Sequence, residues 1–539
     1  MNKVIFVFII LILESFPVLA SQNVVLYHAD FHGHLAQKIY VQLKKVHPAN
    51  KLRVSLSSDK GLRKIIYEKS DDLKQEEVFV LQQRMLPAAK YTITVQILNQ
   101  AGKIQHQVVE TFDKQYDGIP KVGIDEYNNI CVQGKPFFMV APFFVGKERA
   151  IKKWEDYINT LKGVGFMDRR YTIEGWKEFL DLGKKYGKMV VGPLRGYYWT
   201  HRTATGRYQT ADGKYHKDRT INLEKLIEYV NQTKEHESLL MWAWRDEPHL
   251  GGRKAISPGE VRRWTEKCHE LDPHHLVFCN FGGYGFTHIG PKYPEDNWHQ
   301  KHIKKYCYMF YNPDISKKKA GTEGNVEKRH LVADVYSQDY YPIEYEKSAA
   351  KKGYVVSIED MCLAMDRMRE WNYNLAPVMA YVETCDIKGR GTPAPSPEEV
   401  KLLIWANIIH GAKGISWFHY FNPTPPDNLK EMARFLDQIT RLTPAVLGID
   451  YAGKVSVEGN QSGRVDVMIK EYDQKIYLFA ANLKRKENTV RFNIEGMVPN
   501  SQVEVFDESR KISAEVNSFT DNFPKLGVRI YRIKKKSGQ

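Results

Sequence analysis

Cysteine is scarce in this chain, and it does not recur at short spacings. The 539 residues contain six cysteines, with no C-x-x-C pair and no Cys/His spacing typical of a metal site. This scarcity argues against a structural zinc site. One or two disulfides stay open, because their pairing cannot be read from spacing. The six residues are Cys131, Cys268, Cys279, Cys307, Cys362 and Cys385.

Long apolar runs are absent after the first twenty residues, so no later stretch could span a bilayer as a helix. Residues 1–20 combine Lys3, the run VIFVFIILIL and the small residues before position 21, which is typical of a cleaved signal peptide. An uncleaved anchor is the alternative. We expect a signal peptide at 1–20, export to the periplasm or the medium, and no membrane attachment after cleavage.

Acidic residues are outnumbered, with 64 Asp and Glu against 79 Lys and Arg, a net charge of +15. Such a surplus favours acidic partners. No nucleic-acid-binding motif and no Gly-rich phosphate loop occurs, so we expect no nucleic-acid partner. Basic runs such as residues 304–319 can be explained as solvent-exposed surfaces. The more specific alternative is that the positive charge binds an anionic glycan.

The chain is long enough for two or three domains, and its 42% hydrophobic content fits a packed protein. Residues 22–117 alternate apolar and polar side chains between turn signals, which predicts an N-terminal β-sandwich of immunoglobulin or fibronectin type. We expect a linker at 118–134. Alternation returns at 450–535 and predicts a C-terminal β-sandwich.

Between these segments, residues 135–445 contain eight short apolar runs, each followed by a helical pattern or a long loop. Eight such units predict a (β/α)₈ TIM barrel. A doubly wound open sheet is the competing arrangement, but its usual phosphate-binding turn is missing. The fold class is therefore multidomain α/β plus all-β, a (β/α)₈ TIM barrel flanked by N-terminal and C-terminal β-sandwich domains.

Two glutamates end predicted barrel strands, where a TIM barrel carries its chemistry. The fourth strand runs into Asp246-Glu247-Pro248, and the seventh ends at Glu383. A carboxylate at the end of a buried strand is costly unless it is paired or solvated. We therefore expect both glutamates to have a function.

This pattern resembles that of clan A glycoside hydrolases, which are retaining TIM-barrel enzymes. The resemblance rests on an acidic residue before Pro at strand 4, a Glu at strand 7 and Trp417 in strand 8. It implies that Glu247 is the acid/base, that Glu383 is the nucleophile, and that Trp417 meets the sugar. The clan usually has Asn where this chain has Asp246, which puts the contact to the sugar 2-hydroxyl in doubt.

The implied mechanism needs the two carboxyl groups roughly 5–5.5 Å apart. Other predicted strand ends carry polar and aromatic residues that could bind sugar, and the alternative for each is a packed or merely exposed side chain. In the clan, a tyrosine of strand 6 often hydrogen-bonds the nucleophile. The candidate substrate-binding residues are Asp246, Arg195, Tyr197, Trp199, Asn280, Tyr340, Tyr341, Trp417 and His419.

We expect a secreted retaining glycoside hydrolase that acts on a polysaccharide or oligosaccharide, with an anionic glycan as one possibility. A transglycosylase on the same scaffold and a non-catalytic carbohydrate-binding protein with a decayed barrel are the alternatives. A metal-dependent hydrolase would need histidine clusters at the strand ends, and His249 and His419 are too few. We expect no metal, no cofactor and a monomer.

Overall fold

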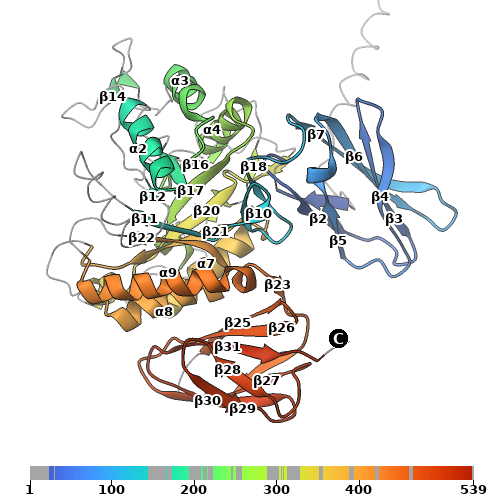
Figure 1. Ribbon diagram of the computed structural model, residues 1–539. Helices are drawn as coiled ribbons and strands as arrows, with labels where there is room; N and C mark the ends of the chain where they lie inside the picture. Colours follow the sequence, from blue (N-terminus) through green and yellow to red (C-terminus); the bar gives the residue numbers. More distant parts are fainter. Residues whose placement is uncertain are drawn as a thin grey trace, which may run out of the picture. The chain divides into compact units, whose positions relative to one another are not determined.

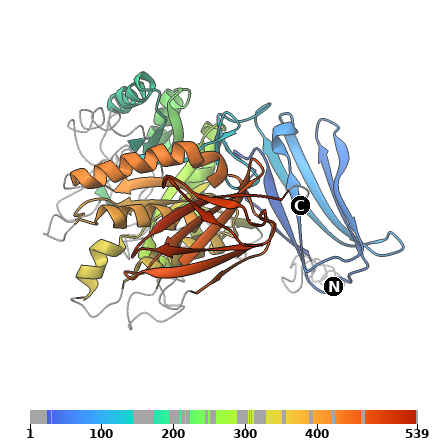
Figure 2. The same ribbon diagram turned by 60° about the horizontal axis from the view of Figure 1, so that its bottom comes forward.

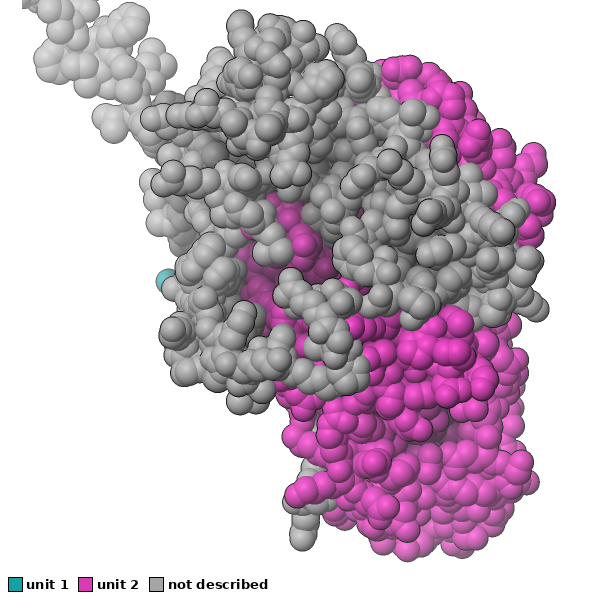
Figure 3. Space-filling view, turned by 90° about the vertical axis from the view of Figure 1, so that its left-hand side faces the viewer, with its two compact units in different colours: residues 1–31, 36–118 teal, residues 32–35, 119–539 magenta. Residues whose placement is uncertain are grey.

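The chain forms two compact units, of which unit 1 comprises residues 1–31 and 36–118 and unit 2 comprises 32–35 and 119–539 (Figure 3). Among the described residues, no helix is both long and apolar enough to cross a membrane. The expected signal peptide lies outside them. The computed structural model describes residues 24–29, 31–143, 165–166, 173–193, 208–209, 215–216, 223–243, 247–249, 258–287, 303–304, 306–307, 309–311, 328–350, 356–387, 394–418, 424–459 and 465–536.

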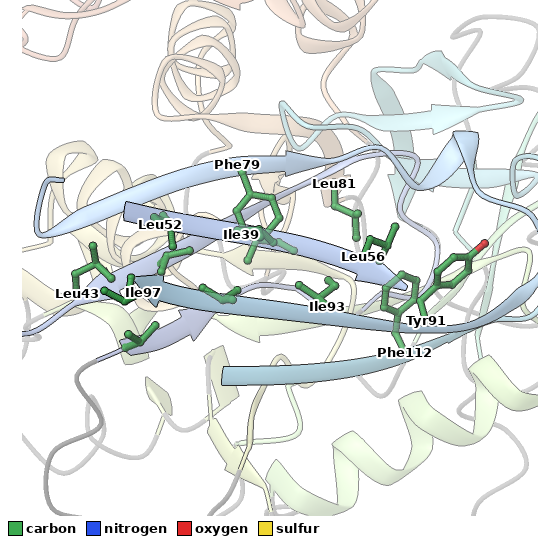
Figure 4. Packing of buried hydrophobic residues seen from close by; sticks show 14 of the residues in the cluster. Ile39, Leu43, Leu52, Leu56, Phe79, Leu81, Tyr91, Ile93, Ile97 and Phe112 are labelled. Carbon is green, nitrogen blue, oxygen red and sulfur yellow. The ribbon is translucent and has the colours of Figure 1, made fainter. Parts of the chain in front are cut away.

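Unit 1 consists of two antiparallel sheets that share one hydrophobic core (Figure 1). Figure 4 shows apolar side chains of both sheets, such as Phe79 and Ile93, directed toward one another. They meet because apolar residues occupy every second position and therefore lie on one face of each strand. The sheets are β1 (Val24–Tyr27), β2 (Gln37–Leu43) and β5 (Glu76–Leu81), and β4 (Arg63–Ser70), β3 (Lys51–Ser58), β6 (Ala89–Leu98) and β7 (Ile104–Lys114).

Eight strands of unit 2 pair in parallel and close into a ring, in which the last strand also pairs with the first. The strands β16, β17 and β21 are buried along almost their whole length, as expected for a parallel sheet covered on both faces. In ring order the strands are β11 (Met139–Phe143), β12 (Gly165–Phe166), β13 (Val190–Pro193), β16 (Leu239–Ala243), β17 (Leu276–Gly282), β20 (Val335–Asp339), β21 (Val378–Glu383) and β22 (Ala412–Phe418).

Helices follow most of the barrel strands, which confirms the mixed α/β class that the sequence predicts. The helix expected after β11 lies outside the described residues. Two of the helices, α7 and α8, begin with a capping box, in which a Ser and an acidic residue three positions later satisfy the first N–H groups. The helices are α2 (Ile173–Lys185), α3 (Leu223–Thr233), α4 (Pro258–Leu271), α6 (Pro342–Ala350), α7 (Ile358–Trp371), α8 (Pro397–Ile409) and α9 (Pro426–Val446).

Residues 118–134, which the sequence suggested as a linker, contain two short antiparallel strands, β8 (Val122–Ile124) and β9 (Ile130–Val132). Ile124 and Ile130 are fully buried in the same cluster as the residues inside the barrel. The backbone N–H of Val122 donates to the carbonyl oxygen of His274, just before β17. This segment therefore covers the N-terminal end of the barrel. A third short strand, β10 (Lys135–Pro136), pairs with β9.

Unit 2 ends in two further antiparallel sheets that share a second hydrophobic core. Their strands are β23 (Ile449–Asp450), β25 (Val465–Tyr472), β26 (Lys475–Asn482), β31 (Val528–Lys534), β28 (Gln502–Val505) and β29 (Arg510–Ser513) in one sheet, and β24 (Val455–Glu458), β27 (Asn488–Ile494) and β30 (Ser518–Phe523) in the other. Two small hairpins, β14 (Tyr208–Gln209) with β15 (Tyr215–His216) and β18 (Met309–Tyr311) with β19 (Lys328–His330), complete the described strands.

The helices α8 and α9 lie side by side between the barrel strands and the C-terminal sheets (Figures 1 and 2). His410, directly after α8, bridges two carboxylates: its Nδ1 is 2.9 Å from Asp366 of α7 and its Nε2 is 2.9 Å from Asp466 of β25. Burial disfavours the protonated form of the ring, but the hydrogen bonds to the two carboxylates outweigh this effect and raise the pKa of His410 to about 12. The charged histidine therefore joins the helix layer to the C-terminal sheets.

All six cysteines lie among the described residues, and all are buried as thiols, with no disulfide between them. Burial raises the pKa of Cys268 and of Cys307 far above the ordinary value of a thiol. These cysteines therefore act as small apolar side chains of the core.

Candidate active site

Glu247 lies just beyond β16, the fourth strand of the barrel, and is half-buried. Its backbone N–H donates to the carbonyl oxygen of Asn280 in the neighbouring strand β17, over 3.0 Å. Its φ angle is +48°, a left-handed conformation that is uncommon for any residue other than glycine. Such strain tends to persist at functional sites, where the surrounding structure holds it in place.

Gly282, the last residue of β17, makes room for this glutamate. A Cβ atom at Gly282 would lie 2.8 Å from Oε1 of Glu247 and 3.4 Å from Nε2 of His249. The first of these distances is too short for any real Cβ contact. The carboxylate of Glu247 therefore lies directly over the end of β17, next to a buried histidine ring, and a side chain at position 282 would displace it.

Glu383 is the last residue of β21, the seventh strand, and only 1% of it is exposed. Its Oε1 accepts the backbone N–H of Ile343 over 2.7 Å, and its Oε2 accepts that of Glu344 over 2.9 Å. Both donors belong to the first turn of α6, where backbone N–H groups have no partner within the helix. Glu383 thus closes the N-terminus of α6, a place where the helix dipole favours a negative charge.

The surroundings of Glu383 have opposing effects on the pKa of its carboxyl group. Burial raises the pKa of Glu383 to about 8, and the two backbone N–H groups act in the opposite sense. Nearby Glu344 and Glu399 also raise the pKa, and the value of about 8 includes their effect. The carboxyl group is therefore close to its titration point near neutral pH, which is common for catalytic acids, bases and nucleophiles.

Four tyrosines lie together after β17 and β20, and two of them feel the charge of a glutamate of the site. The ring of Tyr284 lies 4.5 Å from that of Tyr340 and 4.3 Å from that of Tyr345, and its hydroxyl accepts the backbone N–H of Tyr341. Burial, together with Asp339 and Glu247, raises the pKa of Tyr345 to about 12. Burial also raises the pKa of Tyr284, with Glu383 among the smaller causes. One aromatic cluster therefore lies close to both carboxylates.

The tyrosines of strand 6 were candidate partners of the nucleophile. Tyr340 and Tyr341 are both buried at the end of β20. The hydrogen bonds that the structure describes for Glu383 come from α6, and neither tyrosine is among their donors. The two tyrosines instead line the aromatic cluster around Tyr284.

Asn280 is buried within β17, and its Oδ1 accepts a hydrogen bond from the hydroxyl of Ser337 over 2.6 Å. Its side chain therefore links β17 to β20, while its carbonyl oxygen holds the N–H of Glu247. This residue positions the strand end, in addition to any contact that it makes with a ligand.

Trp417 is fully buried and packs edge-on against Phe435 of α9. Its neighbour Phe418 points the other way, and its ring lies 5.1 Å from that of Tyr341. This difference follows from the alternation of side chains along a strand. The structure thus places Phe418, not Trp417, beside the tyrosine cluster.

The other predicted binding residues, Arg195, Tyr197, Trp199, Asp246 and His419, lie outside the described residues. Three residues of the site were not singled out from the sequence, namely Gly282, Tyr345 and Phe418. Gly282 belongs to the run Gly282-Gly283 directly after a predicted strand, a signal of close backbone approach. Tyr345 carried no comparable signal, since its place depends on where α6 begins.

No family model matches this sequence, and no curated protein matches it. Among solved structures, a putative glycoside hydrolase from Bacteroides vulgatus has 13% identity and a TM-score of 0.45, with 93% of this chain and 98% of that one covered. A family 39 glycoside hydrolase from Bacteroides cellulosilyticus has 11% identity and a TM-score of 0.43, with 95% and 100% covered. β-Glucuronidase 3 from Bacteroides uniformis has 9% identity and a TM-score of 0.34, with 96% and 74% covered. Likenesses this distant transfer no activity to the chain.

Proposed function

We propose that this protein is a glycoside hydrolase that cleaves its substrate with retention of configuration. The observation that carries the proposal is the placement of two glutamates at the C-terminal ends of the fourth and seventh strands of a closed barrel. Chemistry in such barrels takes place at that end. A complete (β/α)₈ barrel between two β-sandwiches is part of this proposal.

In the proposed mechanism Glu383 attacks the anomeric carbon while Glu247 protonates the departing oxygen, which yields a glycosyl ester and a free alcohol. Glu247, now ionised, takes a proton from water, and this water breaks the ester and releases Glu383. The two N–H groups of α6 support these roles because they stabilise the charged form of Glu383. The half-buried Glu247 can exchange protons with solvent and leaving group.

The burial of Glu383 favours a second candidate function, a carbohydrate-binding protein without catalysis. Both carboxylate oxygens already accept hydrogen bonds, and the side chain is 1% exposed. A carboxylate in that position could serve only to hold the N-terminus of α6. A measurement of turnover distinguishes the hydrolase from the non-catalytic binding protein.

The experiment is chemical rescue with activated aryl glycosides, chosen by a screen of the purified wild-type protein. We expect Glu247→Ala to regain turnover with azide, which attacks the glycosyl ester without needing a base, releases Glu383 and gives a glycosyl azide of retained configuration. In Glu383→Ala, azide can enter the space left by the carboxylate and displace the aryl leaving group directly, so we expect a glycosyl azide of inverted configuration. Glu370→Ala, an exposed carboxylate of α7, is the control.

A product of inverted configuration from Glu247→Ala and of retained configuration from Glu383→Ala would mean that the two roles are exchanged. Full activity in both variants would contradict this site. A wild type that binds glycans but turns over none of the aryl glycosides would favour the second candidate.

The natural substrate in this proposal is a polysaccharide or oligosaccharide met outside the cytoplasm by a monomeric protein. The net charge of +15 supports an anionic glycan, drawn in by long-range attraction. We then expect the apparent KM on a charged glycan to rise with salt, since screening weakens this attraction. Equal activity on neutral glycans at both salt levels, and none on charged ones, would contradict the anionic substrate.

A further inference from the structure

The turn between β26 and β27 carries three consecutive basic residues, Lys484, Arg485 and Lys486. The turn belongs to the C-terminal sheets, but two of these residues reach helices of the barrel. Arg485 pairs with carboxylates of α6 and α8, and Lys484 pairs with Glu359 of α7. The partners lie near the starts of these helices. In a TIM barrel each helix follows a strand, so the helix starts lie at the end of the barrel that carries the candidate active site.

Arg485 joins two of these helices through one guanidinium group. Its Nη1 lies 2.7 Å from Oε1 of Glu399 in the first turn of α8, and its Nη2 lies 3.1 Å from Oε2 of Glu346 in α6. The guanidinium group is planar and presents its N–H donors in a fixed arrangement, so it can hold two carboxylates at a set separation. Arg485 therefore connects the start of α6 to the start of α8.

The contact of Arg485 with Glu399 matters more than its contact with Glu346. The side chain of Glu346 is 49% exposed, and exposed ion pairs contribute little because water and salt screen them. The side chain of Glu399 is 11% exposed, and its Oε2 accepts the backbone N–H of Ser396 over 2.8 Å in the capping box of α8. The charge of Glu399 is thus held in place and poorly screened, and Arg485 supplies a cation beside it.

The two helices that Arg485 connects both act on Glu383. Backbone N–H groups in the first turn of α6 donate to both carboxylate oxygens of Glu383. Burial has the largest effect on the pKa of Glu383, and the charges of Glu344 on α6 and Glu399 on α8 raise this pKa as well. A further titratable group described near Glu383 is Tyr284 after β17. A change at Arg485 can therefore reach Glu383 by two routes, through the position of α6 and through the charge of Glu399.

We propose that Arg485 is a positioning residue of the active site, which holds the start of α6 against α8 and compensates the charge of Glu399. The C-terminal sheets thereby contribute to the reaction, because the turn that carries Arg485 belongs to them. This inference rests on the proposed function, in which Glu383 is the nucleophile.

Lys484 provides a matched control, because it lies in the same turn and forms the same kind of ion pair. Its Nζ pairs with Oε1 of Glu359 in the first turn of α7. The donors that the structure describes for Glu383 come from α6, and Glu359 is not among the main causes of the raised pKa of Glu383. Removal of the Lys484 charge therefore disturbs the contact between the turn and the helices without acting on Glu383 by either route.

The test compares Arg485→Met, Arg485→Lys and Lys484→Met in the full-length protein, with initial rates on one aryl glycoside between about pH 5 and pH 10. We expect Arg485→Met to lower kcat/KM roughly threefold at about pH 6, because the uncompensated charge of Glu399 leaves less of Glu383 ionised. The loss should be much smaller above about pH 8, where Glu383 is ionised in either protein. Arg485→Lys, which keeps the charge, should retain most of the wild-type profile, and Lys484→Met should match it.

A double variant separates the charge effect from a general loss of structure. Glu399→Gln removes the charge but keeps an oxygen that can accept the N–H of Ser396, so kcat/KM at low pH should recover when it is combined with Arg485→Met. Two purely structural losses would instead add. Equal losses in Arg485→Met and Lys484→Met, or a low-pH limb that does not move in Arg485→Met, would overturn the proposal.

The titration of Glu383 itself gives a readout that needs no turnover. In protein with isotope-labelled glutamate carboxyl groups, the NMR signal of Glu383 is assigned by its absence in Glu383→Gln. We expect its titration midpoint to lie at higher pH in Arg485→Met than in the wild type and in Lys484→Met. An unchanged midpoint would contradict the role of Arg485, whereas a shifted midpoint in a protein without turnover would contradict only the hydrolase function.

Discussion

At the C-terminal end of the barrel, Glu383 is buried against two backbone N–H groups, whereas at the N-terminal end Asp272 is buried against charged and polar side chains. Nδ1 of His275 lies 2.8 Å from Oδ2 of Asp272, and the indole N–H of Trp242 donates to the same oxygen. The backbone N–H of His274 donates to Oδ1. Both carboxylates thus accept hydrogen bonds on both oxygens, but the donors that the structure describes for Asp272 include a histidine ring, whereas those that it describes for Glu383 are backbone N–H groups.

The pKa values of the two carboxyl groups move in opposite directions. Burial opposes the ionisation of both, and for Glu383 it raises the pKa from 4.5 to about 8. For Asp272 the hydrogen bonds and the charge of His275 outweigh burial and lower the pKa below its ordinary 3.8. Asp272 therefore stabilises the fold above about pH 4 and loses this effect as the pH falls. Glu383 costs stability as the pH rises from 4.5 toward 8.

This difference shows that a buried carboxylate can serve two purposes on one scaffold. Asp272, whose hydrogen-bond donors lower its pKa, is ionised at neutral pH and holds elements together. Glu383, whose described donors are backbone N–H groups and whose charged neighbours include Glu344 and Glu399, stays close to its titration point and is suited to chemistry. The following predictions test this comparison, from the largest expected effect to the smallest.

The first prediction is that Glu383→Gln lowers kcat on the order of 10⁴-fold or more, because the amide cannot form the glycosyl ester. The free energy of unfolding should change by less than about 2 kcal/mol, since one N–H of α6 keeps its acceptor. Steady-state kinetics and urea unfolding measure the two quantities. A large loss of stability with normal kcat would make Glu383 a structural residue.

The second prediction concerns Asp272→Asn, which should lower the free energy of unfolding at pH 7 by about 3–5 kcal/mol, because an amide cannot accept all the buried hydrogen bonds that the ionised carboxylate accepts. Urea unfolding at several pH values measures this. The difference in free energy of unfolding between wild type and variant should become smaller below about pH 4, where the carboxylate of Asp272 in the unfolded chain takes up a proton. The kcat per folded molecule should stay at the wild-type value, and a catalytic loss in fully folded protein would contradict the comparison.

The third prediction is that Gly282→Ala lowers kcat/KM by about 10²-fold, since a displacement of roughly 1 Å at a reacting group has that effect. The added Cβ would push against Oε1 of Glu247. Gly285→Ala is the control, because its Cβ would meet only the side chain of Ile303, at 2.6 Å. Equal losses in both variants would mean that crowding near the barrel, and not the position of Glu247, explains the effect.

The fourth prediction is a pH profile. If Glu383 acts as the ionised nucleophile, kcat/KM should fall about tenfold for each pH unit below its pKa of about 8. If Glu383 were instead the acid, kcat/KM should fall above pH 8, because the proton to be donated would be lost. Initial rates between pH 5 and pH 10 on one aryl glycoside, about the range in which both limbs can appear, distinguish the two cases.

Much of the architecture could be predicted from local patterns in the chain. Alternating apolar residues such as Tyr91, Ile93 and Val95 indicated the strands of unit 1, since a period of two places them on one face. Apolar runs between helical patterns indicated the parallel strands of unit 2. The positions of Glu247 and Glu383 at strand ends could also be predicted, because a polar residue that directly follows an apolar run marks the end of the run.

The environment of each residue could not be predicted from these patterns. The donors to Glu383 come from Ile343 and Glu344, 40 and 39 residues earlier in the chain. Whether Trp417 or Phe418 faces the tyrosines depends on the register of β22 in the ring, and a shift by one residue would exchange them. The ring of His32 stacks on that of His269, although the two residues lie far apart in the chain.

The sequence by itself determined which residues lie in strands, which strands end in carboxylates, and that the chain carries a surplus of positive charge, since these depend on neighbours along the chain. Only the tertiary structure decided that Glu383 is held by α6, that Glu247 lies over Gly282, and that two histidines and an aspartate meet at the other end of the barrel. The pKa of a carboxyl group depends on burial and on partners within a few ångströms. For Glu383 those partners come from a distant part of the chain, and folding alone brings them together.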